Sequence, residues 1–234
     1  MAVAGIVAGG SGMRMGTELP KQFMELCSKP VIIRTTEAFL KSGEITSVII
    51  GINPDWYDYM QNLLEKYSLD RVYLTKGGSD RNETLMNIIN YARKELSAKD
   101  DEIILTHDAV RPFVSERMIK DSIIALEEYD IVTAAVAATD TIIVSEDGQT
   151  ASDFPLRSTM YQVQTPQSFR IGSFERVYSS VSPEEKAAVT DACKLFHLNG
   201  HRVGIISGER NNIKLTYPSD IITAKAICET EENK

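Results

Sequence analysis

Short apolar runs alternate with stretches of helical spacing along most of this chain. The runs are rich in β-branched residues and are bounded by Gly, Pro or Asp, which is typical of strands buried on both faces. They cover residues 3–8, 48–52, 72–75, 103–106 and 131–138. Between two of them, Leu85, Ile89, Ala92 and Leu96 recur at intervals of four and three. This alternation predicts a three-layer α/β fold with a mainly parallel sheet.

Residues 139–166 break this rhythm. Thr141, Ile143 and Ser145 alternate before a turn at Asp147 and Gly148, which predicts an inserted β-hairpin or arm at about residues 139–162. An arm with few apolar residues buries little surface alone, so it either packs on a second subunit or forms a loose surface hairpin. Beyond it we expect helices at residues 173–179 and 184–198, strands at 203–206 and 213–216, and a last helix from residue 219.

Composition limits the class of protein and its partners. The 234 residues are 43% hydrophobic and contain no repeat and no linker, so we expect one domain over residues 1–234. The net charge of −8, with no long basic run, argues against nucleic acid as a partner. A few focused cations and backbone N–H groups can still hold a small anion in an acidic protein.

The cysteines and the apolar stretches indicate a cytoplasmic protein. Cys27, Cys193 and Cys228 are odd in number and include no Cys-x-x-Cys pair, which argues against a disulfide framework and a zinc ribbon. The apolar start lacks the basic region of a signal peptide. No apolar stretch approaches the roughly 20 residues that span a bilayer, so we expect no membrane insertion.

The first predicted strand runs into the motif AGGSGMRMGTELPKQF. In open α/β sheets, ligands bind at the ends of such strands. Gly9, Gly10 and Gly12 allow backbone N–H groups to approach an anion closely, and Arg14 and Lys21 add two cations. We interpret this loop as a cradle for a polyphosphate. The alternative is a tight glycine turn with solvated cations.

Two better-known phosphate motifs do not fit this loop. A Walker loop ends in Gly-Lys-Ser/Thr, whereas Gly10 is followed by Ser11 and Gly12. A dinucleotide fingerprint starting at Gly10 requires Gly or Ala where Met15 stands. The missing fingerprint argues against a dinucleotide-dependent reductase.

A second glycine pair follows the third predicted strand. Gly77 and Gly78 precede Asp80, Arg81 and Thr84 at the start of a predicted helix. This loop can present backbone groups and a hydroxyl to a base or sugar. Taken alone, this loop is only a strand-to-helix turn.

Further polar candidates follow the fourth predicted strand and lie near the C-terminus. Asp108, in HDAVRPF, can accept hydrogen bonds from a ligand hydroxyl, help to hold a divalent cation, or cap the next element. We expect His107 to be a buried, hydrogen-bonded histidine. Lys214 is either a phosphate ligand or an exposed strand residue. His197 and His201 have the spacing of a helical zinc pair, but Asn199 and Gly200 between them should end the helix, so we reject that site.

Five motifs in order resemble the polyol-phosphate cytidylyltransferases. The motifs are AGGSGMRMGTELPKQF, KGGSDRNETL, HDAVRPF, RSTMYQVQTPQ and NNIKLT, and the resemblance covers residues 3–226. It implies a Rossmann-like nucleotidyltransferase fold and a homodimer joined by the arm. It also implies a reaction in which CTP and a polyol phosphate give a CDP-polyol and pyrophosphate, with Mg²⁺ or another divalent cation as cofactor.

The resemblance also assigns roles to individual residues. Arg14 and Lys21 would neutralise the triphosphate and stabilise the transition state, while Arg157 and Lys214 would position the acceptor phosphate. The CTP site would comprise Val7, Ala8, Gly9, Gly10, Gly12, Gly78, Ser79, Asp80, Arg81, Asn82, Thr84 and Ala109. The acceptor site would comprise Asp108, Arg111, Thr141, Arg157, Thr165 and Lys214, with Asp108 also as a weak metal candidate. Because Thr141 and Arg157 fall in the arm, one site would use residues of two subunits.

Within this family the chain is similar to two branches, one using ribitol 5-phosphate in teichoic-acid synthesis and one using methylerythritol phosphate in isoprenoid synthesis. The segments GGSDRN, TDTII, TDACKLF and the Tyr161–Gln162 pair look closer to the ribitol branch. The methylerythritol branch usually has Glu-Arg at Asp80 and Arg81, and an extra basic residue where Ile142 follows the arm's Asp-Thr. The methylerythritol branch and a non-catalytic nucleotide-binding subunit remain the alternatives.

Overall fold

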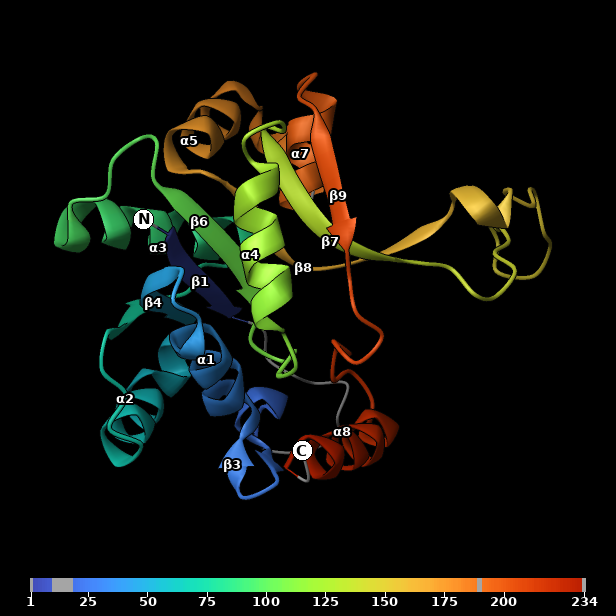
Figure 1. Cartoon of the computed structure of the whole chain (residues 1–234). Helices are drawn as coiled ribbons and strands as arrows, with labels where there is room; N and C mark the ends of the chain where they lie inside the picture. Colours follow the sequence, from blue (N-terminus) through green and yellow to red (C-terminus); the bar gives the residue numbers. More distant parts are fainter. Residues whose placement is uncertain (1, 10–18, 189–190, 233–234) are drawn as a thin grey trace.

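A mainly parallel sheet forms the centre of the computed structural model, which describes residues 2–9, 19–188 and 191–232. Its seven described strands lie in the order β5-β4-β1-β6-β8-β7-β9 (Figure 1). β8 runs antiparallel to β6 and β7, and the other neighbouring pairs are parallel. The expected mainly parallel α/β sheet is confirmed. The strands are β1 (Ala2–Ala8), β4 (Ile45–Ile52), β5 (Val72–Lys76), β6 (Ile103–Asp108), β7 (Ile131–Ala137), β8 (Tyr161–Arg170) and β9 (Val203–Ser207).

Helices cover both faces of the sheet and so complete three layers. One buried cluster joins the sheet to α1 (Val31–Lys41), α2 (Tyr57–Lys66) and α4 (Glu116–Ala125). A second joins it to α3 (Arg81–Leu96), α5 (Ile171–Ser180) and α7 (Ala192–Leu198). The remaining helices are α6 (Pro183–Ala188) and α8 (Pro218–Glu232), and a two-stranded hairpin is formed by β2 (Glu25–Leu26) and β3 (Lys29–Pro30).

The edge at the carboxyl ends of β1 and β6 brings distant segments together. The two strands are adjacent, and Val7 is in register with Asp108. α3 begins at the same edge, because Gly51 in β4 lets it approach closely: a Cβ at Gly51 would lie 2.6 Å from Thr84 Cγ2. Here a 3₁₀ turn, Lys21–Phe23, packs Phe23 against Trp56, with 5.3 Å between ring centroids.

Two predicted elements near the C-terminus are wrong. The expected helix over residues 184–198 is two helices, because α6 ends at Ala188 and Asp191 caps α7, its side chain accepting the Lys194 N–H at 3.1 Å. The expected strand at residues 213–216 is a loop without a sheet partner. Its Leu215 is buried, and the Leu215 N–H donates to the Val110 carbonyl at 3.0 Å.

Residues 139–160 extend away from the sheet (Figure 1). The predicted turn is present, since Gly148 has a φ of +72° and the Asp147 carboxylate accepts the N–H groups of Gln149 and Thr150. A regular β-hairpin is absent from this described segment, which has a single bridge between Val144 and Asp153. The arm is therefore mostly loop.

The described residues bear on two further expectations. No helix among them is long and apolar enough to cross a membrane. Cys27, Cys193 and Cys228 form no disulfide within the described ranges.

Candidate functional site

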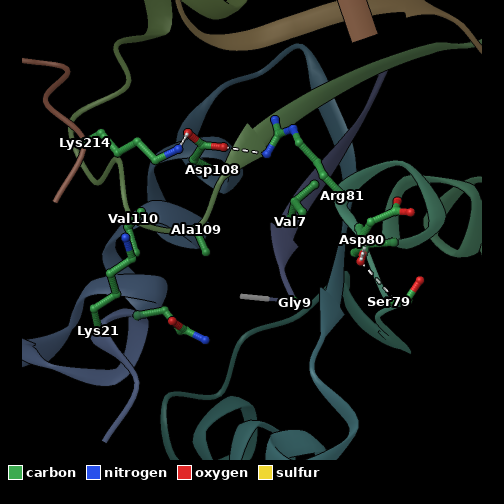
Figure 2. A pocket seen from close by; sticks show the side chains of 13 residues that line it. Val7, Gly9, Lys21, Ser79, Asp80, Arg81, Asp108, Ala109, Val110 and Lys214 are labelled. Carbon is green, nitrogen blue, oxygen red and sulfur yellow. Dashed lines mark hydrogen bonds and ion pairs between the residues drawn. The ribbon is translucent and has the colours of Figure 1, made fainter. Parts of the chain in front are cut away.

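A cavity of about 270 Å³ lies at the carboxyl ends of β1 and β6, beside the start of α3 (Figure 2). It is lined by segments that the sequence analysis selected separately: the end of β1, the second glycine loop, and the turn after β6. Lys21 and Lys214 project toward it from two further segments. The lining residues are Val7, Gly9, Lys21, Gln22, Gly78, Ser79, Asp80, Arg81, Thr84, Asp108, Ala109, Val110 and Lys214.

One wall of the cavity is the capped N-terminus of α3. The Asp80 carboxylate accepts the Glu83 N–H at 2.8 Å. Thr84 Oγ1 donates to the Asp80 carbonyl at 2.8 Å and accepts the Gly78 N–H at 3.0 Å. Hydrogen bonds from the Ser79 side chain and backbone lower the pKa of Glu83. The positive end of the helix dipole therefore faces a fixed loop, an arrangement suited to an anion or a polar ring.

Two glycines are required for this wall. A Cβ at Gly9 would lie 2.9 Å from Thr84 Oγ1, and a Cβ at Gly78 would overlap the Glu83 side chain. Such contacts are too close for any other residue without movement of the loop or of α3. The close approach of both residues to the start of α3 therefore requires glycine at these positions.

A cluster of charged side chains surrounds the buried carboxylate of Asp108. Oδ1 lies 2.6 Å from Arg81 Nη1, while Oδ2 lies 3.0 Å from Lys214 Nζ and 3.3 Å from Arg111 Nε. Figure 2 shows Arg81 and Lys214 reaching Asp108 from opposite sides. Burial raises the pKa of Asp108, but attraction to Arg81, Lys214 and Arg111 outweighs burial and lowers it well below the usual range. Three cations around one ionised carboxylate leave an excess of positive charge beside the cavity.

Buried hydrogen bonds hold this cluster in place. The His107 ring is fully buried, and burial lowers its pKa to about 4, so it is neutral at neutral pH and its Nε2 donates to the Arg111 carbonyl at 3.0 Å. Arg111 Nη1 donates to the Asn212 carbonyl at 2.8 Å. Asn212 Nδ2 donates to the Thr165 carbonyl at 2.8 Å, and Thr165 Oγ1 accepts the Asp108 N–H at 3.1 Å. The expected buried, hydrogen-bonded His107 is confirmed, and it supports the turn that carries Arg111.

Most of the described candidate residues converge on this cavity. Ala8, Asn82, Arg111 and Thr165 do not line it, but they are buried beside its walls. The lining residues selected from sequence are Val7, Gly9, Lys21, Gly78, Ser79, Asp80, Arg81, Thr84, Asp108, Ala109 and Lys214. Three candidates, Gly10, Gly12 and Arg14, lie outside the described residues.

Two candidates are not brought to the cavity of the same chain. Thr141 and Arg157 are exposed on the arm, and Arg157 Nη1 donates to the Thr139 carbonyl at 3.4 Å. Conversely, Gln22 and Val110 line the cavity but were not selected from sequence. Each directly follows a selected residue, so their place in the PKQF and HDAVRPF motifs was the available signal.

No group of three or more His, Cys, Asp or Glu side chains with metal-binding geometry occurs in the described part of the chain. His201 lies beyond the end of α7, with Nδ1 3.2 Å from Asp130 Oδ2, in accord with the rejection of a helical zinc pair. Both oxygens of Asp108 contact cations. The protein side chains described here therefore do not fit a resident metal ion.

The fold is that of a nucleotidyltransferase, with a mainly parallel sheet and a cavity at the strand ends that is lined by cationic side chains. The profile of the 2-C-methyl-D-erythritol 4-phosphate cytidylyltransferase family matches residues 2–230, and the chain belongs to this family. It is therefore a CTP-dependent nucleotidyltransferase.

Individual relatives resemble the chain over nearly its whole length. Ribitol-5-phosphate cytidylyltransferase of Lactiplantibacillus plantarum is 42% identical over 98% of this chain and 99% of its own. Among solved structures, 4-diphosphocytidyl-2C-methyl-D-erythritol synthase of Anaerococcus prevotii is 30% identical, with a TM-score of 0.77 and coverage of 97% of this chain and 98% of that one. The 2-C-methyl-D-erythritol 4-phosphate cytidylyltransferase of Francisella tularensis is 25% identical, with a TM-score of 0.79 and coverage of 96% and 98%.

Proposed function

We propose that this enzyme transfers the cytidylyl group of CTP to D-ribitol 5-phosphate, giving CDP-ribitol and pyrophosphate. One observation carries the choice of acceptor: identity is 42% to the ribitol-5-phosphate enzyme and 30% and 25% to the two methylerythritol-phosphate enzymes described above. CDP-ribitol would then serve as a precursor of wall teichoic acid or a related polymer. Methylerythritol 4-phosphate is the alternative acceptor.

The proposed reaction is an in-line displacement at the α-phosphorus of CTP. An oxygen of the acceptor phosphate forms the new P–O bond as the bond to pyrophosphate breaks. Because that oxygen is already an anionic nucleophile, neither a covalent enzyme intermediate nor a strong general base is needed. The enzyme must align two anions and stabilise charge on the departing pyrophosphate.

The cations around the cavity suit both tasks. We assign CTP to the cavity beside β1 and α3, with Lys21 and Arg14 at its triphosphate. Lys214 and Arg111, held by Asp108, would face the acceptor phosphate and reduce its repulsion from the α-phosphate.

We propose Mg²⁺ as part of the nucleotide substrate. Bound to the phosphates of CTP, it would neutralise charge on the departing pyrophosphate. Metal binding by the CTP phosphates fits a site whose Asp108 carboxylate already contacts Arg81 and Lys214. In this proposal Asp108 is not a metal ligand.

A homodimer would complete the site. The arm exposes apolar side chains, with Phe154 66% and Leu156 70% exposed, which is typical of a surface that packs on a partner. We propose that the arm carries Thr141 and Arg157 to the acceptor in the site of the second subunit. We also propose a cytoplasmic location, where CTP is available and thiols remain reduced.

Pyrophosphate release tests the proposed function. CTP and Mg²⁺ would be supplied with D-ribitol 5-phosphate or methylerythritol 4-phosphate at equal concentration. Faster turnover of ribitol phosphate is the expected result. Preference for methylerythritol phosphate would move the enzyme to isoprenoid synthesis, and no release with either would favour a non-catalytic nucleotide-binding subunit.

A further inference from the structure

Glu209 lies just beyond the end of β9 and does not line the cavity assigned to CTP. Its side chain is 31% exposed, yet its Oε1 accepts hydrogen bonds from two residues at the start of α4. The Ser115 hydroxyl donates to it at 2.6 Å, and Arg117 donates from Nη2 at 2.9 Å and from Nε at 3.2 Å. The Glu209 carboxylate therefore connects the segment after β9 to the N-terminus of α4.

Hydrogen bonds also hold the backbone of Glu209. Gln164, which is buried on β8, donates from Nε2 to the Glu209 carbonyl at 2.9 Å, and its Oε1 accepts the Glu209 N–H at 3.2 Å. The preceding Gly208 N–H donates to the Ala135 carbonyl at 2.8 Å. A Cβ at Gly208 would lie 2.5 Å from Gln164 Oε1 and 3.0 Å from the Ala135 carbonyl carbon, so this close approach requires glycine. Glu209 is therefore fixed to the sheet by its backbone and to α4 by its side chain.

The two segments that Glu209 connects supply the charged cluster around Asp108. Ser115 caps α4 and ends the turn that carries Arg111 beyond Asp108. Glu209 begins the loop that carries Lys214. The Glu209–Ser115 hydrogen bond thus sets the separation of two segments whose side chains meet at one carboxylate.

Further hydrogen bonds join the same two segments nearer the cavity. Arg111 Nη1 donates to the Asn212 carbonyl at 2.8 Å, and the Leu215 N–H donates to the Val110 carbonyl at 3.0 Å. The loop is therefore bound to the turn at its middle and at its end, and the carboxylate of Glu209 binds it at its start.

Lys214 depends on this loop for its position. Its side chain is 42% exposed, so water screens its ion pair with Asp108. A lysine side chain is long and flexible, and a partly exposed ion pair restrains its ammonium group weakly. Within the described ranges the loop has no strand partner, so hydrogen bonds such as those of Glu209 determine where its backbone lies.

On the basis of the proposed function, we infer that Glu209 is a positioning residue for the transfer reaction. By holding the start of the loop against Ser115, it places Lys214 beside Asp108, where Lys214 faces the acceptor phosphate. Arg117 compensates the charge of Glu209, so the carboxylate adds little repulsion toward the phosphates. The reacting atoms must be aligned closely, because a displacement of about 1 Å can reduce the rate about 100-fold.

The test measures pyrophosphate release at saturating Mg²⁺-CTP while ribitol 5-phosphate is varied. Glu209→Ala should lower kcat/KM for ribitol 5-phosphate about tenfold, because the loop loses its contact with α4. Glu209→Gln keeps an oxygen that accepts from Ser115 Oγ, so it should retain at least about half of the wild-type value. Glu128→Ala is the matched control: Glu128 pairs with Arg202 at 3.4 Å, both side chains are exposed, and its loss should leave the constants unchanged.

A variant on the other side of the contact excludes loss of folding as the cause. Ser115→Asp keeps a favourable N-cap for α4, but it removes the hydroxyl donor and places two carboxylates together. It should lower kcat/KM about tenfold, as Glu209→Ala does. The thermal unfolding midpoint of both variants should stay within about 4 °C of wild type.

Two backgrounds separate the positioning of Lys214 from a general effect on the enzyme. In a Lys214→Ala chain the side chain that Glu209 positions is absent, so Glu209→Ala should cause at most about a twofold further loss. In a Lys21→Ala chain Lys214 is present, so Glu209→Ala should still lower kcat/KM about tenfold.

The outcomes distinguish this inference from the proposed function. Wild-type kcat/KM in Glu209→Ala, or an equal further loss in both backgrounds, would overturn the inference while the proposed function stands. A Glu209→Gln variant as impaired as Glu209→Ala would overturn it too, because the contact with Ser115 would not be responsible. If wild type prefers methylerythritol phosphate, the proposed acceptor is wrong, and the same comparisons with that acceptor decide the role of Glu209. Absence of turnover by wild type with either acceptor would overturn both proposals.

Discussion

Replacing Asp108 with asparagine tests whether the buried carboxylate holds the cationic cluster together. Asp108 is 6% exposed and contacts Arg81, Arg111 and Lys214. Breaking a buried ion pair by removing one partner costs about 3–5 kcal/mol. The Lys214 side chain is 42% exposed, so water screens its contact and it adds little. We therefore expect Asp108→Asn to lower the free energy of unfolding by about 3 kcal/mol.

Urea unfolding followed by far-ultraviolet circular dichroism at pH 7 measures this change. Asp121→Asn is the control, because Asp121 pairs with Arg117 on the surface and both side chains are more than a third exposed. That change should cost at most about 0.5 kcal/mol. If Asp108→Asn were no more destabilising than Asp121→Asn, the carboxylate would not organise the cluster.

The pH dependence of the free energy of unfolding provides a second comparison, between wild type and Asp108→Asn. The cations lower the pKa of Asp108 in the folded state. Its stabilising contribution is therefore complete above the pKa of an unfolded carboxyl, about 4, and is lost as the pH falls below that value. Asp108→Asn should lose less stability than wild type over that acid range, and an equal loss would contradict this assignment.

Three further predictions concern single groups. Lys21→Ala should reduce kcat about 100-fold or more in the pyrophosphate assay with little change in thermal midpoint, and a near wild-type rate would refute its role. His107 has a folded pKa of about 4, below the unfolded value of about 6.5, so wild type should lose about 3 kcal/mol between pH 6.5 and 4; His107→Gln, which keeps an N–H donor, should lose this dependence in urea titrations. Mixing inactive Arg157→Ala and Lys214→Ala chains should restore part of the pyrophosphate release through mixed dimers, and no recovery would place Arg157 in the site of its own chain.

Sequence patterns predicted the strands that are apolar and missed the one that is polar. β1, β4, β6 and β7 are rich in buried aliphatic residues and β5 contains partly buried Val72 and Leu74, so composition reveals these strands. β8 contains Gln164, Thr165, Gln167 and Ser168, which are all buried. These side chains are accommodated by tertiary partners, such as Asp191 Oδ2, which accepts from Gln167 Nε2 at 2.6 Å. Such partners lie far along the chain and leave no local periodicity.

The sequence predicted most residues of the site but not the contacts between their side chains. Arg81 and Asp108 were selected for different substrates, yet in the structure they form one ion pair at 2.6 Å. The pairing depends on the packing of α3 against β1 and β6, which no spacing in the sequence specifies. Lys214 illustrates the same limit, because its loop was predicted as a strand and is instead held by the Arg111–Asn212 hydrogen bond.

The contact between Phe23 and Trp56 provides a built-in optical reporter. Trp56 is the single tryptophan of the chain, and Phe23, which packs against its ring, ends the short turn that begins at Lys21. Emission of that indole therefore reports on the surroundings of the cationic turn without an attached dye. Nucleotide titrations and inhibitor screens can therefore use the unlabelled protein, and we expect the emission of Trp56 to change when a ligand binds beside Lys21.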